Sequence, residues 1–295
     1  MTQPQARDLC PALGAEITDV DLTTRLDDDT VAFLREKFDD RGVLLFRGAE
    51  VARPHVYALC EVLRGQDLPT EEEAAAGAER QAHFYVSNKR EKATAPLGSL
   101  AWHSDAMWTN EPFEVLSLYA EEVAPPVAPT LFANATRGWE TLPPELRARL
   151  VGRDAVQVGG PEDLHARRRK NFPDDVMQTV RDNAPAFTFP LVRPHPRTGR
   201  MTLVISENHT REIAGLPLDE SDDLLDAVFA HLYSPENTYE LEWRNHDLVV
   251  WDNIATHHAR RSVTLEGPTR TLRKQGLPMP TSDALTKVTT FQLAR

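Results

Sequence analysis

The apolar residues between positions 26 and 42 recur with the period of an α-helix. Val31, Leu34 and Phe38 lie three or four positions apart and are separated by mainly charged residues, so they would form one apolar stripe on a helix. The acidic run Asp27–Asp29 can cap the first turn, and Gly42 can end the last one. The pattern predicts a packing helix over residues 26–42, followed directly by a buried strand over the apolar residues 43–46.

Two further helices are predicted by similar patterns. One begins near the Pro143-Pro144 pair, where proline suits the first turn and Thr141 can cap it, and ends before Gly152. The other runs from about residue 220 to 232, where an apolar stripe stops before a Ser-Pro pair. We interpret both as packing helices.

Short apolar segments dominate the second half of the chain. They are separated by Pro, Gly, Asn and Asp, which are typical of turns, and they predict strands over residues 115–120, 201–206, 248–251, 262–265 and 271–274. Because helices do not alternate regularly with these strands, the pattern favours an antiparallel sandwich or barrel. We therefore expect a mainly β protein with peripheral helices, forming a single domain over residues 1–295.

The composition excludes several classes of protein. With 45 acidic and 33 basic residues among 295, the formal charge of −12 argues against non-specific binding to nucleic acid or to an anionic membrane. No apolar run approaches the roughly 18 residues of a membrane-spanning helix, and the first ten residues lack the apolar segment of a signal peptide. We expect a cytoplasmic protein in which Cys10 and Cys60 are free thiols.

One histidine and one carboxylate stand at a spacing that suits a metal. In an extended segment, residues two apart point to the same face, so His103 and Asp105 can present an imidazole and a carboxylate to one ion. By itself the His-x-Asp pattern is weak, because it arises often by chance.

A third ligand is available where the apolar strand at 248–251 runs into a turn and then into the pair His257-His258. Two histidines and one carboxylate on one face of a metal leave the opposite face open, which suits ferrous iron that must bind a chelating acid and oxygen. Adjacent strand residues face opposite ways, so only one of the two histidines can bind the ion, and local physics does not choose between them.

Basic residues follow on the predicted strand at 271–274. Arg270 and Lys274 share one face of this strand, and Arg273 should face the other side of the strand or the substrate end of the pocket. An arginine that faces the inside of a barrel must be paired, and a dicarboxylic acid is a suitable bidentate partner. The alternative is a solvated basic strand.

Together these segments resemble the taurine dioxygenase family of iron(II)- and 2-oxoglutarate-dependent oxygenases over nearly the whole chain. Trp102-His103-Ser104-Asp105 is similar to the first ligand motif of the family, and Trp251-Asp252-Asn253 is similar to the lead-in to its distal ligand. Further segments also look like the family: Leu13–Ile17 with Val20–Leu22, Gly42–Gly48, Arg193–Pro196 and Thr198–Arg200.

The resemblance implies a double-stranded β-helix, or jelly-roll, core and a set of site residues. In the family four residues separate the Asp-Asn pair from the distal ligand, which selects His258 and makes His257 a neighbour. Arg270, which follows His258 by 12 residues, matches the arginine that binds the distal carboxylate of 2-oxoglutarate. Thr130 matches a threonine that adds a hydroxyl there, although a strand threonine without a ligand is as good an interpretation.

Substrate recognition is less determined by the sequence. Tyr85 and Asn88, in the segment 83–89 that precedes the first ligand motif, and Trp108, just after the motif, are our candidates for the mouth of the site, with ordinary packing or exposure as the alternative. Arg273 or Lys274 could bind an anionic group of a small substrate. The basic run Arg167–Lys170 is interpreted as a solvated loop, with a lid over an anionic substrate as the alternative.

We therefore expect an iron(II)- and 2-oxoglutarate-dependent dioxygenase that uses O2 to hydroxylate or cleave a small anionic organic substrate, with release of succinate and CO2. The rival enzyme is a zinc hydrolase, which would leave Arg270 unexplained. The rival outside enzymology is a non-catalytic jelly-roll binding module, which would not need both three metal ligands and a dicarboxylate anchor. A homo-oligomer is left open.

Overall fold

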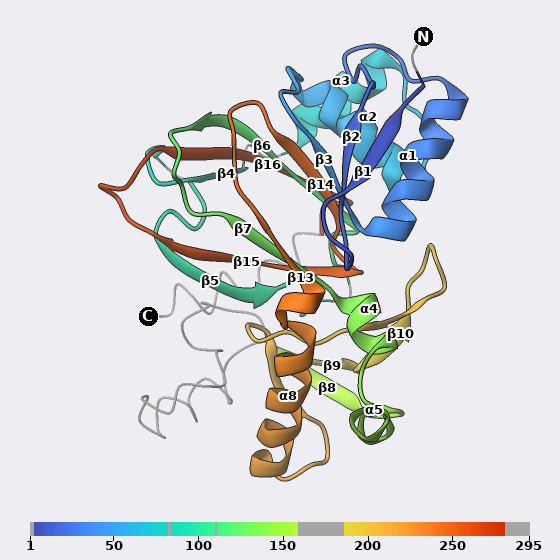
Figure 1. Cartoon of the computed structure of the whole chain (residues 1–295), viewed down its shortest axis with the longest axis vertical. Coiled ribbons are helices and arrows are strands. Elements are labelled where there is room, and N and C mark those ends of the chain that lie inside the picture. The colour runs from blue at the N-terminus through green and yellow to red at the C-terminus, as the bar shows by residue number, and fades with distance from the viewer. Residues whose placement is uncertain (1–2, 82–83, 92, 110, 159–185, 281–295) are drawn as a thin grey trace.

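The computed structural model describes residues 3–81, 84–91, 93–109, 111–158 and 186–280. Within these residues the chain is mostly β-structure, with helices at its periphery (Figure 1). The basic run Arg167–Lys170 lies outside the described residues. No helix in the described part of the chain is long and apolar enough to cross a membrane.

A seven-stranded sheet forms one side of the core. Its spatial order is β1 (Gln5–Asp8), β2 (Ala15–Thr18), β3 (Val43–Phe46), β14 (Leu248–Asp252), β6 (Val115–Val123), β16 (Arg270–Leu277) and β4 (Phe84–Ser87). All neighbouring strands are antiparallel except β2 and β3. The predicted strand at 43–46 is confirmed, and those at 115–120, 248–251 and 271–274 are confirmed with longer bounds.

A four-stranded antiparallel sheet forms the other side. Its order is β13 (Thr238–Leu241), β7 (Thr130–Asn134), β15 (Thr256–Val263) and β5 (Gly98–His103). Apolar side chains of both sheets share one buried cluster, in which the ring centroids of Phe132 and Trp251 are 5.5 Å apart. Neither sheet closes on itself, and the two together make the predicted jelly-roll core.

Two helices near the N-terminus, α1 (Asp28–Arg41) and α2 (Arg53–Leu63), cover the outer face of the seven-stranded sheet, and α3 (Glu71–Arg80) packs against α2 (Figure 1). The side chain of Asp27 accepts a hydrogen bond from the Thr30 amide at 2.8 Å, and Gly42 ends α1 with a positive φ of 69°. The predicted first helix is thus confirmed, including its caps. Its Leu34 and Phe38 are buried against the sheet.

A third group of elements lies beside the four-stranded sheet. It contains α4 (Ala135–Glu140), α5 (Pro144–Leu150), α8 (Leu218–Leu232), the short η1 (Pro235–Asn237), the sheet of β12 (Thr210–Ile213), β8 (Asp154–Val158) and β9 (Ala186–Pro190), and the hairpin of β10 (Val192–Pro194) and β11 (Met201–Leu203). The helices α4, α5 and α8 bury their apolar side chains in one cluster with residues of β8, β11 and β12. Both α5 and α8 were predicted.

Two local predictions are wrong. Thr141 does not cap α5, because it ends α4 instead, where its hydroxyl donates to the carbonyl of Arg137 at 2.8 Å. A separate strand over 262–265 does not exist, because β15 begins at Thr256 and ends at Val263. The strand predicted at 201–206 is also shorter, since β11 ends at Leu203. Cys10 and Cys60 are free thiols, as expected.

Candidate functional site

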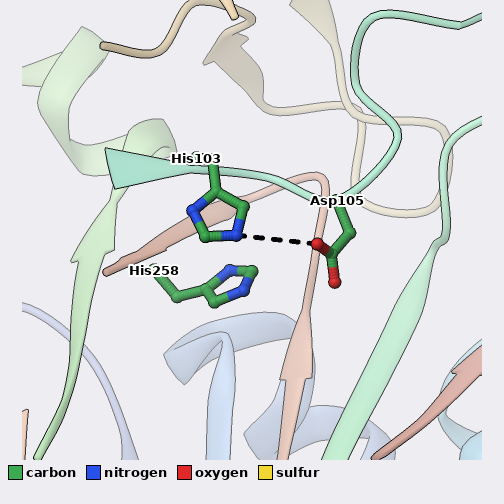
Figure 2. A group of neighbouring side chains, drawn as sticks. All are labelled: His103, Asp105 and His258. Atoms are coloured by element: carbon green, nitrogen blue, oxygen red, sulfur yellow. Dashed lines mark ion pairs between the residues drawn. The ribbon is translucent and has the colours of Figure 1, made fainter. Parts of the chain in front are cut away.

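His103 and Asp105 stand where β5 ends (Figure 2). The Nδ1 atom of His103 lies 2.7 Å from the backbone oxygen of Ala101, so the Nδ1 proton is donated there and Nε2 carries the lone pair. That Nε2 lies 3.6 Å from Oδ1 of Asp105. The backbone thus sets the tautomer that a metal ligand requires.

His258 comes to the same place from β15. Strand pairing sets His258 directly opposite His103, with 4.1 Å between the ring centroids. One ligand atom each from His103, Asp105 and His258 lies within 4.8 Å of the others, and no other metal-binding cluster of this kind occurs in the part of the chain that the structure describes. Two imidazoles and one carboxylate match the donor set of ferrous iron.

His257 faces the other way. Its Nδ1 lies 3.0 Å from the hydroxyl of Tyr233, which directly follows α8, and the ring of Tyr233 stacks on that of Trp102. Burial lowers the pKa of His257 to about 3. It is therefore a neutral packing residue, as the family register implies.

The charges of the cluster suit a cation. Burial by itself would raise the pKa of Asp105, but the charge of Lys274, with smaller contributions from His258 and His103, holds that pKa well below its usual range. Burial lowers the pKa of His258 far below its ordinary value. An ionised carboxylate and a neutral imidazole are the protonation states that metal binding needs.

Asn253 links the two ligand segments. Its Oδ1 accepts from the backbone amide of Asp105 at 3.0 Å, and its Nδ2 donates to the backbone oxygen of Asp105 at 2.9 Å. The hydroxyl of Ser104 donates to the backbone oxygen of Asn253. The segment that carries Asp105 is therefore fixed to the turn that precedes His258.

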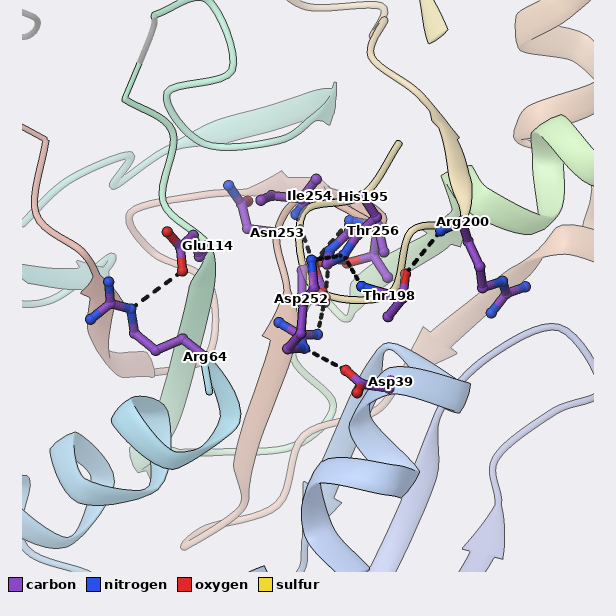
Figure 3. Close-up of polar contacts among 12 residues, drawn as sticks. Asp39, Arg64, Glu114, His195, Thr198, Arg200, Asp252, Asn253, Ile254 and Thr256 are labelled. Atoms are coloured by element: carbon purple, nitrogen blue, oxygen red, sulfur yellow. Dashed lines mark hydrogen bonds and ion pairs between the residues drawn. The ribbon is translucent and has the colours of Figure 1, made fainter. Parts of the chain in front are cut away.

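Asp252 organises the same turn through a buried ion network (Figure 3). Its Oδ1 accepts from the amides of Ile254 and Ala255 at 3.0 Å each, and its Oδ2 lies 3.0 Å from Nε2 of His195 and 2.5 Å from Arg197. Burial would raise the pKa of Asp252, but His195 and Arg197 lower it overall. His195 is 2% exposed and is therefore a buried partner of the turn.

A cavity of about 240 Å³ adjoins the cluster. Thr130, Arg260, Arg270 and Lys274 line it together with His103, Asp105 and His258. Arg270 is 3% exposed, and its Nε and Nη2 donate to the backbone oxygen of Ala128 at 2.8 Å and to the hydroxyl of Thr130 at 3.0 Å. Its Nη1 is buried without a hydrogen-bond partner.

The electrostatics of Arg270 suit an anionic ligand. Burial, together with the charge of Arg260, lowers the pKa of Arg270 to about 9. A buried guanidinium with one nitrogen unbonded is unfavourable, and a carboxylate would both neutralise it and accept the remaining proton. A dicarboxylic acid therefore fits the residues that are present.

The other predicted residues divide between the two faces of the sheet. Lys274 lies in the cavity, and its Nζ contacts Oδ2 of Asp105. Arg273 faces away and pairs with Glu121 at 3.0 Å, and Tyr85, opposite it on β4, lies near the same acid. Asn88 donates to the backbone oxygens of residues 264 and 268, both at 3.0 Å.

Tyr85, Asn88 and Arg273 do not line the cavity. Side chains alternate along β4 and β16, so Tyr85 and Arg273 point away from it. The side-chain amide of Asn88 is bonded to backbone groups. Substrate contact by these three stays a prediction that no described contact supports.

Trp108 packs on His209, with 4.5 Å between ring centroids, and the ring of His209 lies 6.1 Å from that of His103. The indole Nε1 of Trp108 is buried without a hydrogen-bond partner.

The comparison with known proteins decides the family. Residues 5–274 match the model of the taurine catabolism dioxygenase TauD, TfdA family. The chain belongs to the TauD/TfdA family. Pentalenolactone F synthase of Streptomyces arenae is 30% identical over 230 residues, which cover 68% of this chain and 76% of that protein.

Further members and structures agree. The 2-oxoglutarate-dependent 2,4-dichlorophenoxyacetate dioxygenase of Cupriavidus pinatubonensis is 27% identical, with 87% of this chain and 91% of that one covered. The crystal structure of AAD-2 with Mn(II) and N-oxalylglycine has the same fold, with a TM-score of 0.71 at 23% identity, and covers 93% of this chain and 97% of that one. This TauD/TfdA protein is an iron(II)- and 2-oxoglutarate-dependent dioxygenase, and the zinc hydrolase and the non-catalytic module find no support.

Proposed function

We propose that His103, Asp105 and His258 bind the iron(II) ion of this dioxygenase, and that Arg270 with Thr130 binds the distal carboxylate of 2-oxoglutarate. One observation carries the proposal: Nη1 of Arg270 is buried without a partner in a cavity that the three ligand residues also line. Nearly all buried polar groups in proteins are hydrogen-bonded, so an unbonded one beside a metal-type cluster indicates a ligand.

The protein side chains and the bound groups have different roles in the reaction. When bound, iron and 2-oxoglutarate supply the activation of O2, with succinate and CO2 as co-products. The chain supplies binding and orientation: Asn253 and Lys274 hold Asp105, and the backbone of Ala101 holds His103. Thr130, which also accepts from the indole of Trp243 at 3.1 Å, holds Arg270 in place.

The charge of the cavity supports a small anionic substrate. Even without Arg260, two cations, Arg270 and Lys274, line it with one carboxylate, Asp105. A ferrous ion and a 2-oxoglutarate dianion add equal and opposite charges, so an excess of positive charge remains for an acid. Lys274 is our choice for the residue that attracts this acid, and Trp108 beside the cluster is our choice for a second contact.

The names of relatives support the same substrate class. One is a 2,4-dichlorophenoxyacetate dioxygenase and another, from Pseudomonas putida, is a sulfate ester dioxygenase, and both names denote acids. We propose that the product is hydroxylated, or is cleaved after hydroxylation. The relatives differ among themselves, so they do not select one acid.

The cofactor assignment is tested by spectroscopy. Anaerobic addition of ferrous iron and 2-oxoglutarate should produce a weak visible charge-transfer band, and oxygen should then yield succinate. Absence of both would overturn the proposal. Arg270→Ala, measured at the same metal loading, should move the 2-oxoglutarate concentration at which the band appears, whereas Arg261→Ala, an exposed control paired with Glu240, should not.

The substrate class is tested with a panel. Carboxylates, sulfonates and sulfate esters, each with a neutral analogue of equal size, should be compared by oxygen uptake and succinate release. The acids should stimulate both more strongly than their neutral analogues. Lys274→Met should remove that difference, and equal stimulation by neutral compounds in the unmodified enzyme would show that charge does not select the substrate.

We also propose a cytoplasmic enzyme that does not bind nucleic acid. The two cysteines are unpaired, which suits a reducing compartment, and the formal charge is −12. Fractionation of the producing cells and a DNA retention assay would test these points, and light scattering would give the oligomeric state.

A further inference from the structure

Arg260 is a second buried arginine of the cavity. It follows His258 by two residues on β15, so both side chains point to the same face of the strand. Arg260 is 5% exposed and lines the cavity with Arg270. Nothing in the assignment of the metal ligands or of the 2-oxoglutarate anchor uses it.

The guanidinium of Arg260 is bonded to one segment of backbone. Its Nη1 donates to the oxygen of Ala95 at 2.7 Å, and its Nη2 donates to the oxygens of Leu97 and Gly98 at 3.0 and 2.8 Å. One side chain of the four-stranded sheet therefore binds three carbonyl groups within residues 95–98, which form the end of the connection from β4 and the first residue of β5.

That connection is a wall of the cavity. Thr94 and Ala95 both line the cavity. Thr94 is fixed from the other side, because its amide and hydroxyl donate to the oxygen of Tyr85 at 2.7 and 3.1 Å. Ala95 has a positive φ of 44°, a conformation that non-glycine residues rarely adopt and that persists only where surrounding contacts impose it. Arg260 provides such contacts.

Arg260 also acts on Arg270 through its charge. The two guanidinium groups are close enough for the charge of Arg260 to lower the pKa of Arg270. Two cations at one cavity favour a doubly charged acid over a singly charged one. The hydrogen bonds of Arg260 and its charge thus act on the same ligand in different ways, and the two effects can be separated.

We propose that Arg260 is a positioning residue for the co-substrate: it holds the wall formed by residues 94–98, and this wall limits the length of the 2-oxo diacid that the cavity accepts. The inference rests on the proposed function, since it takes the cavity as the 2-oxoglutarate site. It concerns co-substrate selectivity, which neither the metal ligands nor Arg270 determine alone.

The test compares 2-oxoglutarate with 2-oxoadipate, which is one methylene longer. Each acid is titrated anaerobically into the iron-loaded enzyme, with the charge-transfer band as the signal. Arg260→Met should weaken 2-oxoglutarate about tenfold, which corresponds to about 1.4 kcal/mol, and 2-oxoadipate less, so that the preference for the shorter acid falls at least about threefold. Arg261→Met, one residue away and exposed, should leave both affinities unchanged.

Arg260→Lys separates charge from hydrogen bonds. It keeps the positive charge but cannot reproduce three bonds from a planar fork. Compared with Arg260→Met, Arg260→Lys should restore much of the affinity for 2-oxoglutarate. It should restore little of the preference for 2-oxoglutarate over 2-oxoadipate. Full recovery of the preference by Arg260→Lys would overturn the positioning role.

Hydrogen exchange gives a readout without cofactor. In the metal-free protein, amides of residues 94–98 should exchange faster in both Arg260 variants than in wild type or Arg261→Met. Unchanged exchange and an unchanged preference would each overturn the inference. Failure of the wild-type enzyme to give any band with 2-oxoglutarate would instead refute the proposed function, while the exchange result would still show whether Arg260 holds the wall.

Discussion

The two faces of β16 show how neighbouring basic residues acquire different roles. Arg273 points outward, where it pairs with Glu121 of β6 at 3.0 Å and lies 4.7 Å from the ring centroid of Tyr119. Arg270 points inward, where no acid pairs with it among the described residues and its Nη1 is unbonded. The arginine that already has an anionic partner stabilises the fold, and the one that lacks a partner is available for a ligand.

β15 repeats the same division. His258 points inward to His103 and Asp105, and His257 points outward to the hydroxyl of Tyr233. In both strands the side chains of one face line the cavity. Those of the other face bind residues of neighbouring strands or of the segment that follows α8. Paired substitutions on the two faces therefore measure how completely the roles are separated.

The largest difference is expected between the two histidines. His258→Ala removes a proposed metal ligand and should abolish the charge-transfer band with ferrous iron and 2-oxoglutarate. His257→Ala should retain the band, although loss of a buried hydrogen bond should lower the free energy of unfolding by about 1–3 kcal/mol. Anaerobic titration and thermal unfolding of both variants measure these effects, and the opposite pattern would mean that the other histidine binds the metal.

The two arginines should differ next most strongly. Breaking a buried charge pair costs roughly 3–5 kcal/mol, so Arg270→Ala should weaken 2-oxoglutarate by roughly a hundredfold to several thousandfold. Arg273→Ala should change that affinity little and cost at most about 1 kcal/mol of stability, because its pair with Glu121 is partly exposed. Isothermal titration with 2-oxoglutarate compares them, and a larger effect of Arg273→Ala would move the anchor to the outer face.

The smallest expected effect is the pH dependence of the 2-oxoglutarate affinity, which Arg270 on the inner face of β16 controls. Only the protonated form of Arg270 attracts a carboxylate, and burial with the charge of Arg260 lowers its pKa to about 9 in the free protein. The affinity for 2-oxoglutarate should therefore be steady below pH 9 and fall above it by at most about tenfold per pH unit. Calorimetric titration from pH 7 to 10, with Mn(II) in place of iron, should show this decline in wild type and not in Arg270→Ala.

Local sequence patterns determined the elements with strong periodicity. The stripe of α1, its capping aspartate and its final glycine are all local, and α8 and the apolar strand β3 are equally clear. The closeness of His103 and Asp105 was also a local property, because β5 ends at His103 and Asp105 lies in the turn that follows directly. The resemblance to the family then selected His258 and Arg270, which local physics had left open.

Tertiary structure decided which face of each strand is inside. β15 is buried on both faces over its first five residues, so its sequence shows no alternation that would distinguish His257 from His258 or draw attention to Arg260. Asp252 and His195, like Arg260 and Ala95, are far apart in sequence and meet only through strand pairing and packing. Periodicity determines that neighbouring side chains alternate, but the direction in which they point depends on distant segments that cover the strand.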